Sequence, residues 1–135
     1  MKKRTRIVIL AVCALMLYLT AANALAITLN SRASVEYGSN TKVAGVNQTL
    51  NKNYLYGEVA STYGTGTSDK RLIGRMCTRG EIWIHTRDEI GASPYQILDT
   101  LYWDNDGEET GTFFAEAFAP NRNHTGYCLV KQDGH

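Results

Sequence analysis

The sequence lacks most of the groups that metalloproteins and hydrolases use for their chemistry. Its 135 residues include only three cysteines and three histidines. No C-x-x-C pair and no pair of neighbouring histidines occurs, so the pattern does not predict a Cys/His metal site. There is also no G-x-S-x-G motif to mark a nucleophilic serine. We therefore expect no catalytic residue, metal or cofactor. A small secreted hydrolase is a third hypothesis, because a catalytic triad is assembled in space rather than in sequence.

The N-terminal segment has the three parts of a secretory signal peptide. Residues 1–6 are basic, residues 7–19 form an apolar run, and residues 24–26 give the small-residue pattern Ala-Leu-Ala. The apolar run is shorter than the roughly 20 residues that a transmembrane helix needs. The pattern is typical of a bacterial signal peptide over residues 1–26, helical in its apolar part and cleaved after Ala26. It predicts one secreted domain over residues 27–135, without a stable membrane anchor.

The charge of the expected exported chain argues against nucleic acid as a partner. Four of the fourteen basic residues lie in the leader, so ten remain against thirteen acidic ones, a net charge of −3. A nucleic-acid-binding surface or a surface for anionic membranes usually carries a basic excess. The sequence favours a partner such as an extracellular protein or a carbohydrate.

Two cysteines remain after removal of the leader, Cys77 and Cys128. In an exported protein an even number of cysteines predicts a disulfide, and two allow a single pairing. The two cysteines are 128 − 77 = 51 positions apart. Closing a loop of this length would stabilise the fold by roughly 4 kcal/mol in the chain-entropy model. We therefore expect a structural Cys77–Cys128 disulfide.

Alternating apolar and polar residues, separated by turn signals, predict an all-β fold. Several short strands at this spacing are typical of a small antiparallel β-sandwich, immunoglobulin-like or jelly-roll-like, and a small β-barrel is the alternative. The segments with the clearest strand pattern are residues 32–38, 52–62, 71–78, 81–87, 111–119 and 126–131.

Residues 93–103 fit two structures. As a helix, the segment would begin with Ser93 as N-cap and Pro94 at the first position, and four apolar residues would share one face. As a strand, it would bury Ile97 and Leu101 on one side. Its length and the Asp-Gly pair that follows favour a strand leading into a hairpin.

An acidic segment follows, with four carboxylates between Asp104 and Glu109. An EF-hand loop beginning at Asp104 would need glycine at its sixth position and glutamate at its twelfth, where this chain has Glu109 and Ala115. Glycosidase chemistry would need two carboxylates held apart and desolvated, which neighbouring acids on a turn are not. The Asp106-Gly107 pair instead favours a hairpin turn.

A candidate binding face follows from the alternation in two of the predicted strands. If Ile82 and Ile84 point inward, Trp83 between them faces solvent, and the alternation places His85 and Arg87 on the same outer face. By the same alternation, the tyrosines on either side of Leu55 also face solvent. Aromatic rings and arginine on an exposed sheet are residue types that bind sugars, peptides or proteins. The alternative is ordinary packing and cross-strand pairing. The residues of this candidate face are Tyr54, Tyr56, Trp83, His85 and Arg87.

These patterns favour a secreted, disulfide-stabilised, non-enzymatic β-sandwich that acts as an extracellular binding module. The alternative from another class is a secreted antagonist of the bacteriocin or toxin type that acts on neighbouring cells. A membrane-active protein usually carries an amphipathic basic stretch, and residues 27–135 have none.

Overall fold

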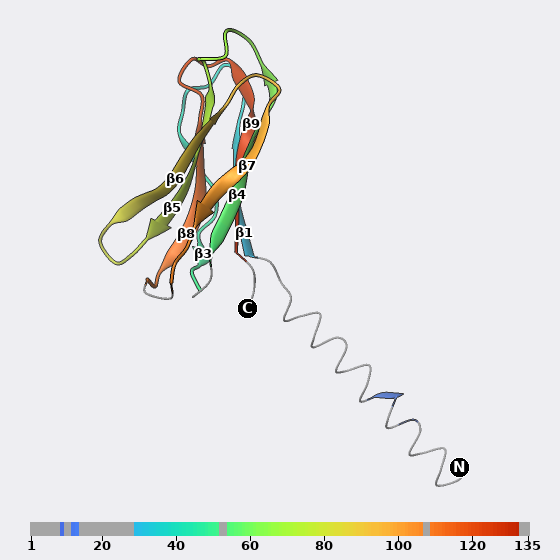
Figure 1. Cartoon of the computed structure of the whole chain (residues 1–135), viewed down its shortest axis with the longest axis vertical. Helices are drawn as coiled ribbons and strands as arrows, with labels where there is room; N and C mark the ends of the chain where they lie inside the picture. Colours follow the sequence, from blue (N-terminus) through green and yellow to red (C-terminus); the bar gives the residue numbers. More distant parts are fainter. Residues whose placement is uncertain (1–8, 10–11, 14–28, 52–53, 107–108, 133–135) are drawn as a thin grey trace.

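The protein is built from strands arranged in two antiparallel sheets that pack face to face (Figure 1). The computed structural model describes residues 9, 12–13, 29–51, 54–106 and 109–132, so the predicted signal peptide lies almost wholly outside the described residues. Within that part of the chain, no helix is long and apolar enough to cross a membrane. The strands are β1 (Leu29–Val35), β2 (Val43–Ala44), β3 (Gln48–Thr49), β4 (Leu55–Gly64), β5 (Leu72–Arg79), β6 (Ile84–Ala92), β7 (Ile97–Trp103), β8 (Thr112–Phe118) and β9 (His124–Gln132).

Within each sheet, strands from the beginning of the chain pair with strands from its end. The first sheet has the order β1-β9-β4-β7, and the second has the order β2-β8-β5-β6, with β3 also paired to β8. The prediction of an all-β fold with two antiparallel sheets is confirmed, and the described strands do not close into the alternative barrel. Every segment predicted as a strand overlaps an observed one, whereas the two-residue strands β2 and β3 were not predicted.

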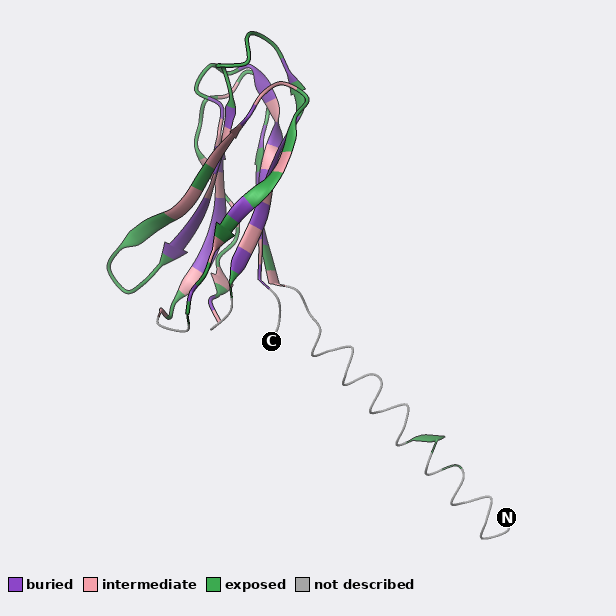
Figure 2. Ribbon diagram, viewed as in Figure 1, coloured by how far each residue is buried: buried purple, intermediate pink, exposed green. Residues whose placement is uncertain are grey.

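The core lies between the sheets because side chains alternate between the two faces of each strand. In β9 every second residue from His124 to Gln132 is buried. The facing strands β5 and β8 are less regular, because each contains three consecutive buried residues, drawn in purple in Figure 2. Leu72 and Met76 of β5 and Phe113 of β8 complete the core from the second sheet, and all three are fully buried.

The segment 93–103 is a strand in its second part, as predicted. Ser93 begins a turn, in which the Gln96 backbone N–H donates to the Ser93 carbonyl at 3.0 Å. The expected burial of Ile97 beside Leu101 was wrong, because Ile97 is 65% exposed. Between its pairings with Gly57 and Val59, β7 contains one extra residue, so the alternation shifts. This bulge turns Leu98 inward with Leu101 and leaves Ile97 outside.

The predicted disulfide is not formed in the structure, where Cys77 and Cys128 are free, buried thiols. Cys128 belongs to the core between the sheets. Its Sγ lies against the backbone of β5, 3.6 Å from the Arg75 carbonyl oxygen. Cys77 directly follows Met76, whose side chain points into the core. Because side chains alternate along a strand, the Cys77 side chain points to the opposite face of β5. Two thiols on opposite faces of one strand cannot meet the geometry of a disulfide.

The β5–β6 hairpin also differs from the prediction. The Gly80 N–H donates to the Trp83 carbonyl at 3.1 Å, which closes the turn of the hairpin. Ile82 and Ile84 were expected to point inward, but both are exposed. The end of this hairpin extends beyond the body of the sandwich (Figure 1). No facing strand is therefore available to bury the two isoleucines.

Candidate functional site

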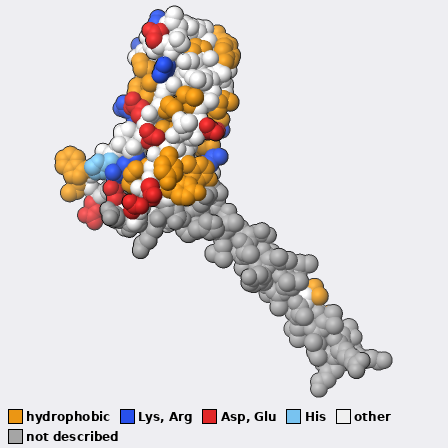
Figure 3. All heavy atoms as spheres, in the orientation of Figure 1, with side chains coloured by type: hydrophobic (Ala, Val, Ile, Leu, Met, Phe, Trp, Pro, Cys, Tyr) orange, Lys and Arg blue, Asp and Glu red, His pale blue; other side chains and the backbone are white. Residues whose placement is uncertain are grey.

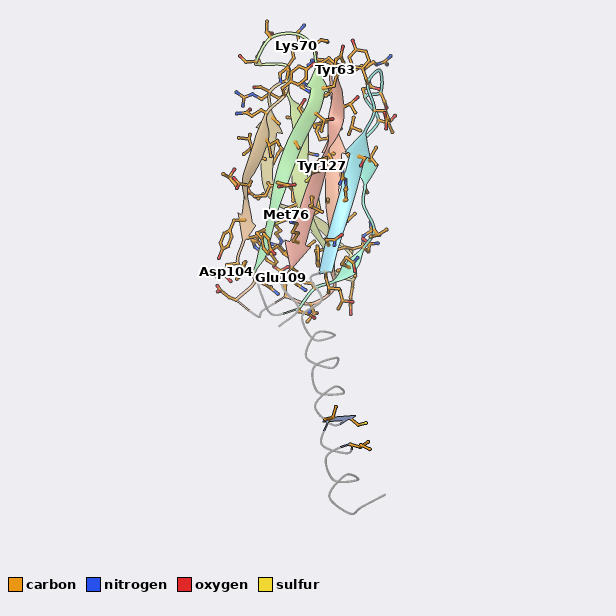
Figure 4. The ribbon with its side chains drawn as sticks, turned by 90° about the vertical axis from the view of Figure 1, so that its right-hand side faces the viewer. Tyr63, Lys70, Met76, Asp104, Glu109 and Tyr127 are labelled. Carbon is orange, nitrogen blue, oxygen red and sulfur yellow. The ribbon has the colours of Figure 1, made fainter. Side chains whose placement is uncertain are left out.

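The outer face of the first sheet carries a row of polar and aromatic side chains that crosses three strands. Tyr56 of β4 is paired with Lys131 of β9 on one side and with Tyr102 of β7 on the other. Residues paired across antiparallel strands lie on the same face, so these three side chains are neighbours. Figure 4 shows this face toward the viewer, with Tyr127 labelled on the same sheet. We call Tyr54, Tyr56 and Tyr102 the tyrosine face.

The rings of the tyrosine face contact one another. The ring of Tyr54 lies 5.9 Å from that of Tyr56 and 5.7 Å from that of Tyr102, measured between centroids. Tyr102 is 55% exposed and Tyr54 is 43% exposed. Tilted rings at this spacing stabilise one another and present flat apolar surface with polar hydroxyls at the edge.

A shallow pocket of about 250 Å³ opens beside these rings. It lies at the β7 bulge, between the positions where Gly57 and Val59 pair with that strand. Bulges often redirect side chains at binding sites. Here the pocket brings two carboxylates and one ammonium group together next to an aromatic ring. Its lining residues are Tyr56, Gly57, Glu58, Asp99 and Lys131.

Glu58 is held in place by its neighbours on β9 and β1. The Tyr127 hydroxyl donates a hydrogen bond to Glu58 Oε1 at 2.9 Å. The Arg32 guanidinium carbon lies 3.8 Å from the centre of the Tyr127 ring. The hydrogen bond to Glu58, together with partial burial, raises the pKa of Tyr127 above its ordinary value. Tyr127 therefore remains a hydrogen-bond donor at neutral pH, and Glu58 keeps a fixed orientation at the pocket.

The structure divides the predicted binding face into three parts. Tyr54 and Tyr56 lie on the tyrosine face, whereas Trp83 and His85 lie on the β5–β6 hairpin of the other sheet and are exposed. Arg87 is held by contacts within the protein. Its Nε donates to Thr78 Oγ1 at 2.8 Å, and its guanidinium carbon lies 4.6 Å from the Trp103 ring centre. The five residues do not form one surface.

The acidic segment forms a turn in its described part. The Asp106 backbone N–H donates to Asp104 Oδ1 at 3.0 Å, and Asp106 has a positive φ of 49°. Glu109 forms an ion pair with Arg87. Gly107 and Glu108 lie outside the described residues. Within the described residues, no group of three acidic, histidine or cysteine side chains is placed to hold a metal ion.

A second tyrosine cluster lies at the other end of the sandwich and was not predicted. Tyr63 contacts Tyr37 at 5.3 Å and Tyr95 at 6.0 Å, between ring centroids. Figure 4 shows Tyr63 at the end opposite to Asp104 and Glu109. Tyr95 has a positive φ of 61°, which is uncommon for a non-glycine residue. The three tyrosines come from separate parts of the chain, so no local pattern could reveal the cluster.

His124 begins β9 and is fully buried. Its Nδ1 lies 2.7 Å from Ser61 Oγ, and its Nε2 lies 2.6 Å from the Lys70 carbonyl oxygen. Ser61 is 2% exposed, so the serine and histidine have no access to a substrate. Both ring nitrogens are satisfied, and the pair holds β4, β9 and the segment near Lys70 together.

Comparisons with known proteins give a similarity of fold alone. No protein-family model and no curated protein matches the sequence. Among solved structures, the Yersinia pseudotuberculosis-derived mitogen is similar, with 10% identity, a TM-score of 0.46, and coverage of 79% of this chain and 86% of that one. PirA is 7% identical, with a TM-score of 0.43 and coverage of 75% and 90%. The infectious bursal disease virus Gx strain structure is 10% identical, with a TM-score of 0.43, and covers 81% of this chain and 32% of that one. Similarities this low carry no argument about function.

Proposed function

We propose that the protein is an exported, non-enzymatic binding protein whose tyrosine face and adjoining pocket take a carbohydrate. The observation that carries the proposal is a group of three touching tyrosine rings, two of them exposed, beside a pocket that Tyr56 lines together with charges of both signs. A sugar has apolar C–H faces that pack on aromatic rings, and hydroxyl groups that both donate and accept hydrogen bonds. The site offers a partner to each of these groups.

The polar groups of the pocket suit hydroxyls better than they suit the centre of a protein interface. Glu58 and Asp99 accept hydrogen bonds, and Lys131 donates them. The centre of a protein–protein interface is usually depleted of charged residues. In this pocket three of the five lining residues are charged, which is unlike that arrangement. Its volume of about 250 Å³ suits one or two sugar rings rather than a large ligand.

Two further observations support the proposal. The strand orders β1-β9-β4-β7 and β2-β8-β5-β6 favour the jelly-roll form of the sandwich, an architecture that also occurs in lectin domains. This is an analogy of architecture and gives no ligand by itself. The signal-like residues 1–26 would send such a protein to a compartment where it meets extracellular glycans. N-terminal sequencing of protein from the culture medium should begin at Ile27, and an intact Met1 in a membrane fraction would contradict export.

The test is binding of the protein to a glycan array, followed by calorimetry with the glycans that bind. The Tyr102→Ala variant should bind about tenfold more weakly, because the ring at the edge of the cluster is lost. Asp99→Asn should also weaken binding, since the change removes a charged acceptor from the pocket. The glycan should be recovered intact after incubation, as expected of a protein without catalysis.

The matched control is Tyr37→Ala. Tyr37 is 53% exposed and contacts another tyrosine, as Tyr102 does, but it belongs to the cluster at the other end. This variant should bind like the parent. Absence of glycan binding, or a loss in Tyr37→Ala with none in Tyr102→Ala, would refute the proposed site. Cleavage of the glycan would instead show that the protein is a hydrolase.

A further inference from the structure

The end of the β5–β6 hairpin exposes three consecutive large apolar side chains. Ile82 is 80% exposed, Trp83 is 70% exposed and Ile84 is 55% exposed. Figure 3 shows hydrophobic atoms standing out from the body of the molecule at the end of this hairpin, beside the pale blue of a histidine. We call residues 82–84 the apolar tip. Single exposed hydrophobic residues are common, but a contiguous group marks an interaction surface.

A backbone hydrogen bond closes the base of the apolar tip. Arg79 of β5 is paired with Ile84 of β6, and the Gly80 N–H donates to the Trp83 carbonyl. An unpaired backbone group costs several kcal/mol in hydrocarbon, so segments that enter lipid must satisfy their own hydrogen bonds. The bond between Gly80 and Trp83 meets this condition for two groups at the base of the tip. The hairpin can therefore place its apolar side chains at a membrane interface without opening the turn.

The charges near the apolar tip include no basic excess. Arg79 precedes it and Glu81 adjoins it, and the ion pair of Arg87 with Glu109 lies further along β6. The neighbouring turn adds Asp104 and Asp106, which would be repelled by an anionic surface. An anionic surface is therefore disfavoured, whereas a lipid surface without net charge can accept the apolar side chains.

We infer that the apolar tip inserts into the interfacial region of a bilayer made of zwitterionic lipids. Tryptophan favours the membrane–water interface, and isoleucine favours the hydrocarbon just below it. The tip is a narrow convex end, and a lipid surface accepts it without a matching concave pocket. Glu81 and Arg79 limit the depth of insertion, because charged groups remain at the headgroups. Binding is reversible, since only three side chains enter the lipid.

The experiment uses the two tryptophans of the chain, Trp83 and Trp103, as separate reporters. With excitation selective for tryptophan, only Trp83 emits in Trp103→Phe, and only Trp103 emits in Trp83→Phe. The full chain is mixed with phosphatidylcholine vesicles, with and without brominated acyl chains. Trp83 emission should shift to the blue and be quenched by the brominated lipid, whereas Trp103 emission should stay unchanged. The readout concerns Trp83 itself, so lipid binding by the apolar residues 7–19 does not produce it.

Cosedimentation with the same vesicles gives a second measurement that needs no change at Trp103. Trp83→Ala should lower the affinity for vesicles about tenfold or more relative to Trp83→Phe. Raising the salt concentration should have little effect. Tyr95→Ala is the control, because Tyr95 is 66% exposed and lies at the other end of the sandwich. Tyr102→Ala should still bind vesicles, which separates this inference from glycan binding.

Unquenched Trp83 emission on vesicles would overturn the inference, as would equal vesicle affinities of Trp83→Ala and Trp83→Phe. Binding that requires anionic lipid and disappears at high salt would overturn it as well, because it would show attraction by charge. If the apolar tip stays in water in the presence of vesicles, its exposed side chains would instead indicate a binding surface for a protein.

Discussion

Gly74 of β5 offers a sharp test of how closely the two sheets pack. A Cβ atom at this position would lie 2.2 Å from Val59 Cγ2 and 3.1 Å from both Cβ and Sγ of Cys128. Val59 and Cys128 are fully buried on the opposing sheet. Val59 is β-branched, so its χ1 angle has little freedom to move the methyl away. The Gly74→Ala variant must therefore separate the sheets locally or strain the valine.

Two opposing effects decide the sign of the change. Alanine in place of glycine stabilises a protein by about 0.4–1 kcal/mol through the unfolded state when the site has room. Overpacking of a well-packed core destabilises by about 1–3 kcal/mol. With a contact this short, overpacking prevails, and Gly74→Ala should lower the free energy of unfolding by about 1–2 kcal/mol. For a domain of this size the melting temperature would fall by roughly 5–15 °C.

Val59→Ala supplies the partner for a double-mutant cycle. Alone it should cost about 2 kcal/mol, through lost burial and the cavity that remains. In the double variant the methyl group introduced at position 74 occupies the space left by Val59 Cγ2. The two costs should then fall short of additivity by about 1 kcal/mol or more, measured by urea unfolding at 25 °C.

Gly80→Ala is the matched glycine control, because a Cβ atom there meets nothing within 4 Å. It should leave stability unchanged or raise it slightly. Gly74→Ala with the stability of Gly80→Ala, or strictly additive costs in the cycle, would refute the proposed sheet-to-sheet contact.

Two further predictions concern the cysteines and Arg87. Burial raises the pKa of Cys77 to about 11 and that of Cys128 to about 12, from an ordinary value of 9.0. The unfolded thiols ionise first as the pH rises, so the free energy of unfolding should fall between about pH 9 and 12. Neither thiol should react with a thiol reagent in the native protein at about pH 8, and a reductant should not change the melting temperature; a marked fall would show a disulfide instead. Arg87→Ala should destabilise by about 1–3 kcal/mol in urea unfolding, because it leaves the buried Thr78 hydroxyl without its donor and removes the contact with Trp103. A loss below about 0.5 kcal/mol would contradict that role.

The local alternation of residues was enough to predict the all-β class and most of the strands. In β9 the period of two is regular from His124 to Gln132, and burial follows it residue by residue. This works because the period of a strand is a local property of the backbone. The turn in the acidic segment also follows from local chemistry, since Asp106 adopts the positive φ that aspartate tolerates. The signal peptide remains a prediction from composition.

Only the tertiary structure decided which side of each strand meets the core. One extra residue in β7 reverses the alternation, so Ile97 is exposed although its spacing from Leu101 predicted burial. The phase of β5 places Cys77 on the face opposite to the side that Cys128 approaches, and a count of cysteines contains no information about phase. Ile82 and Ile84 stay exposed because no strand faces the end of their hairpin.

The candidate site depends on the tertiary structure for the same reason. The sequence alone placed Tyr54 and Tyr56 on the outward face of the predicted strand 52–62, with residue types suited to binding. Their contact with Tyr102 and the pocket beside Asp99 depend on how β7 pairs with β4. Pairing between distant strands is set by the packing of the whole core, and a pattern read along one strand does not contain it.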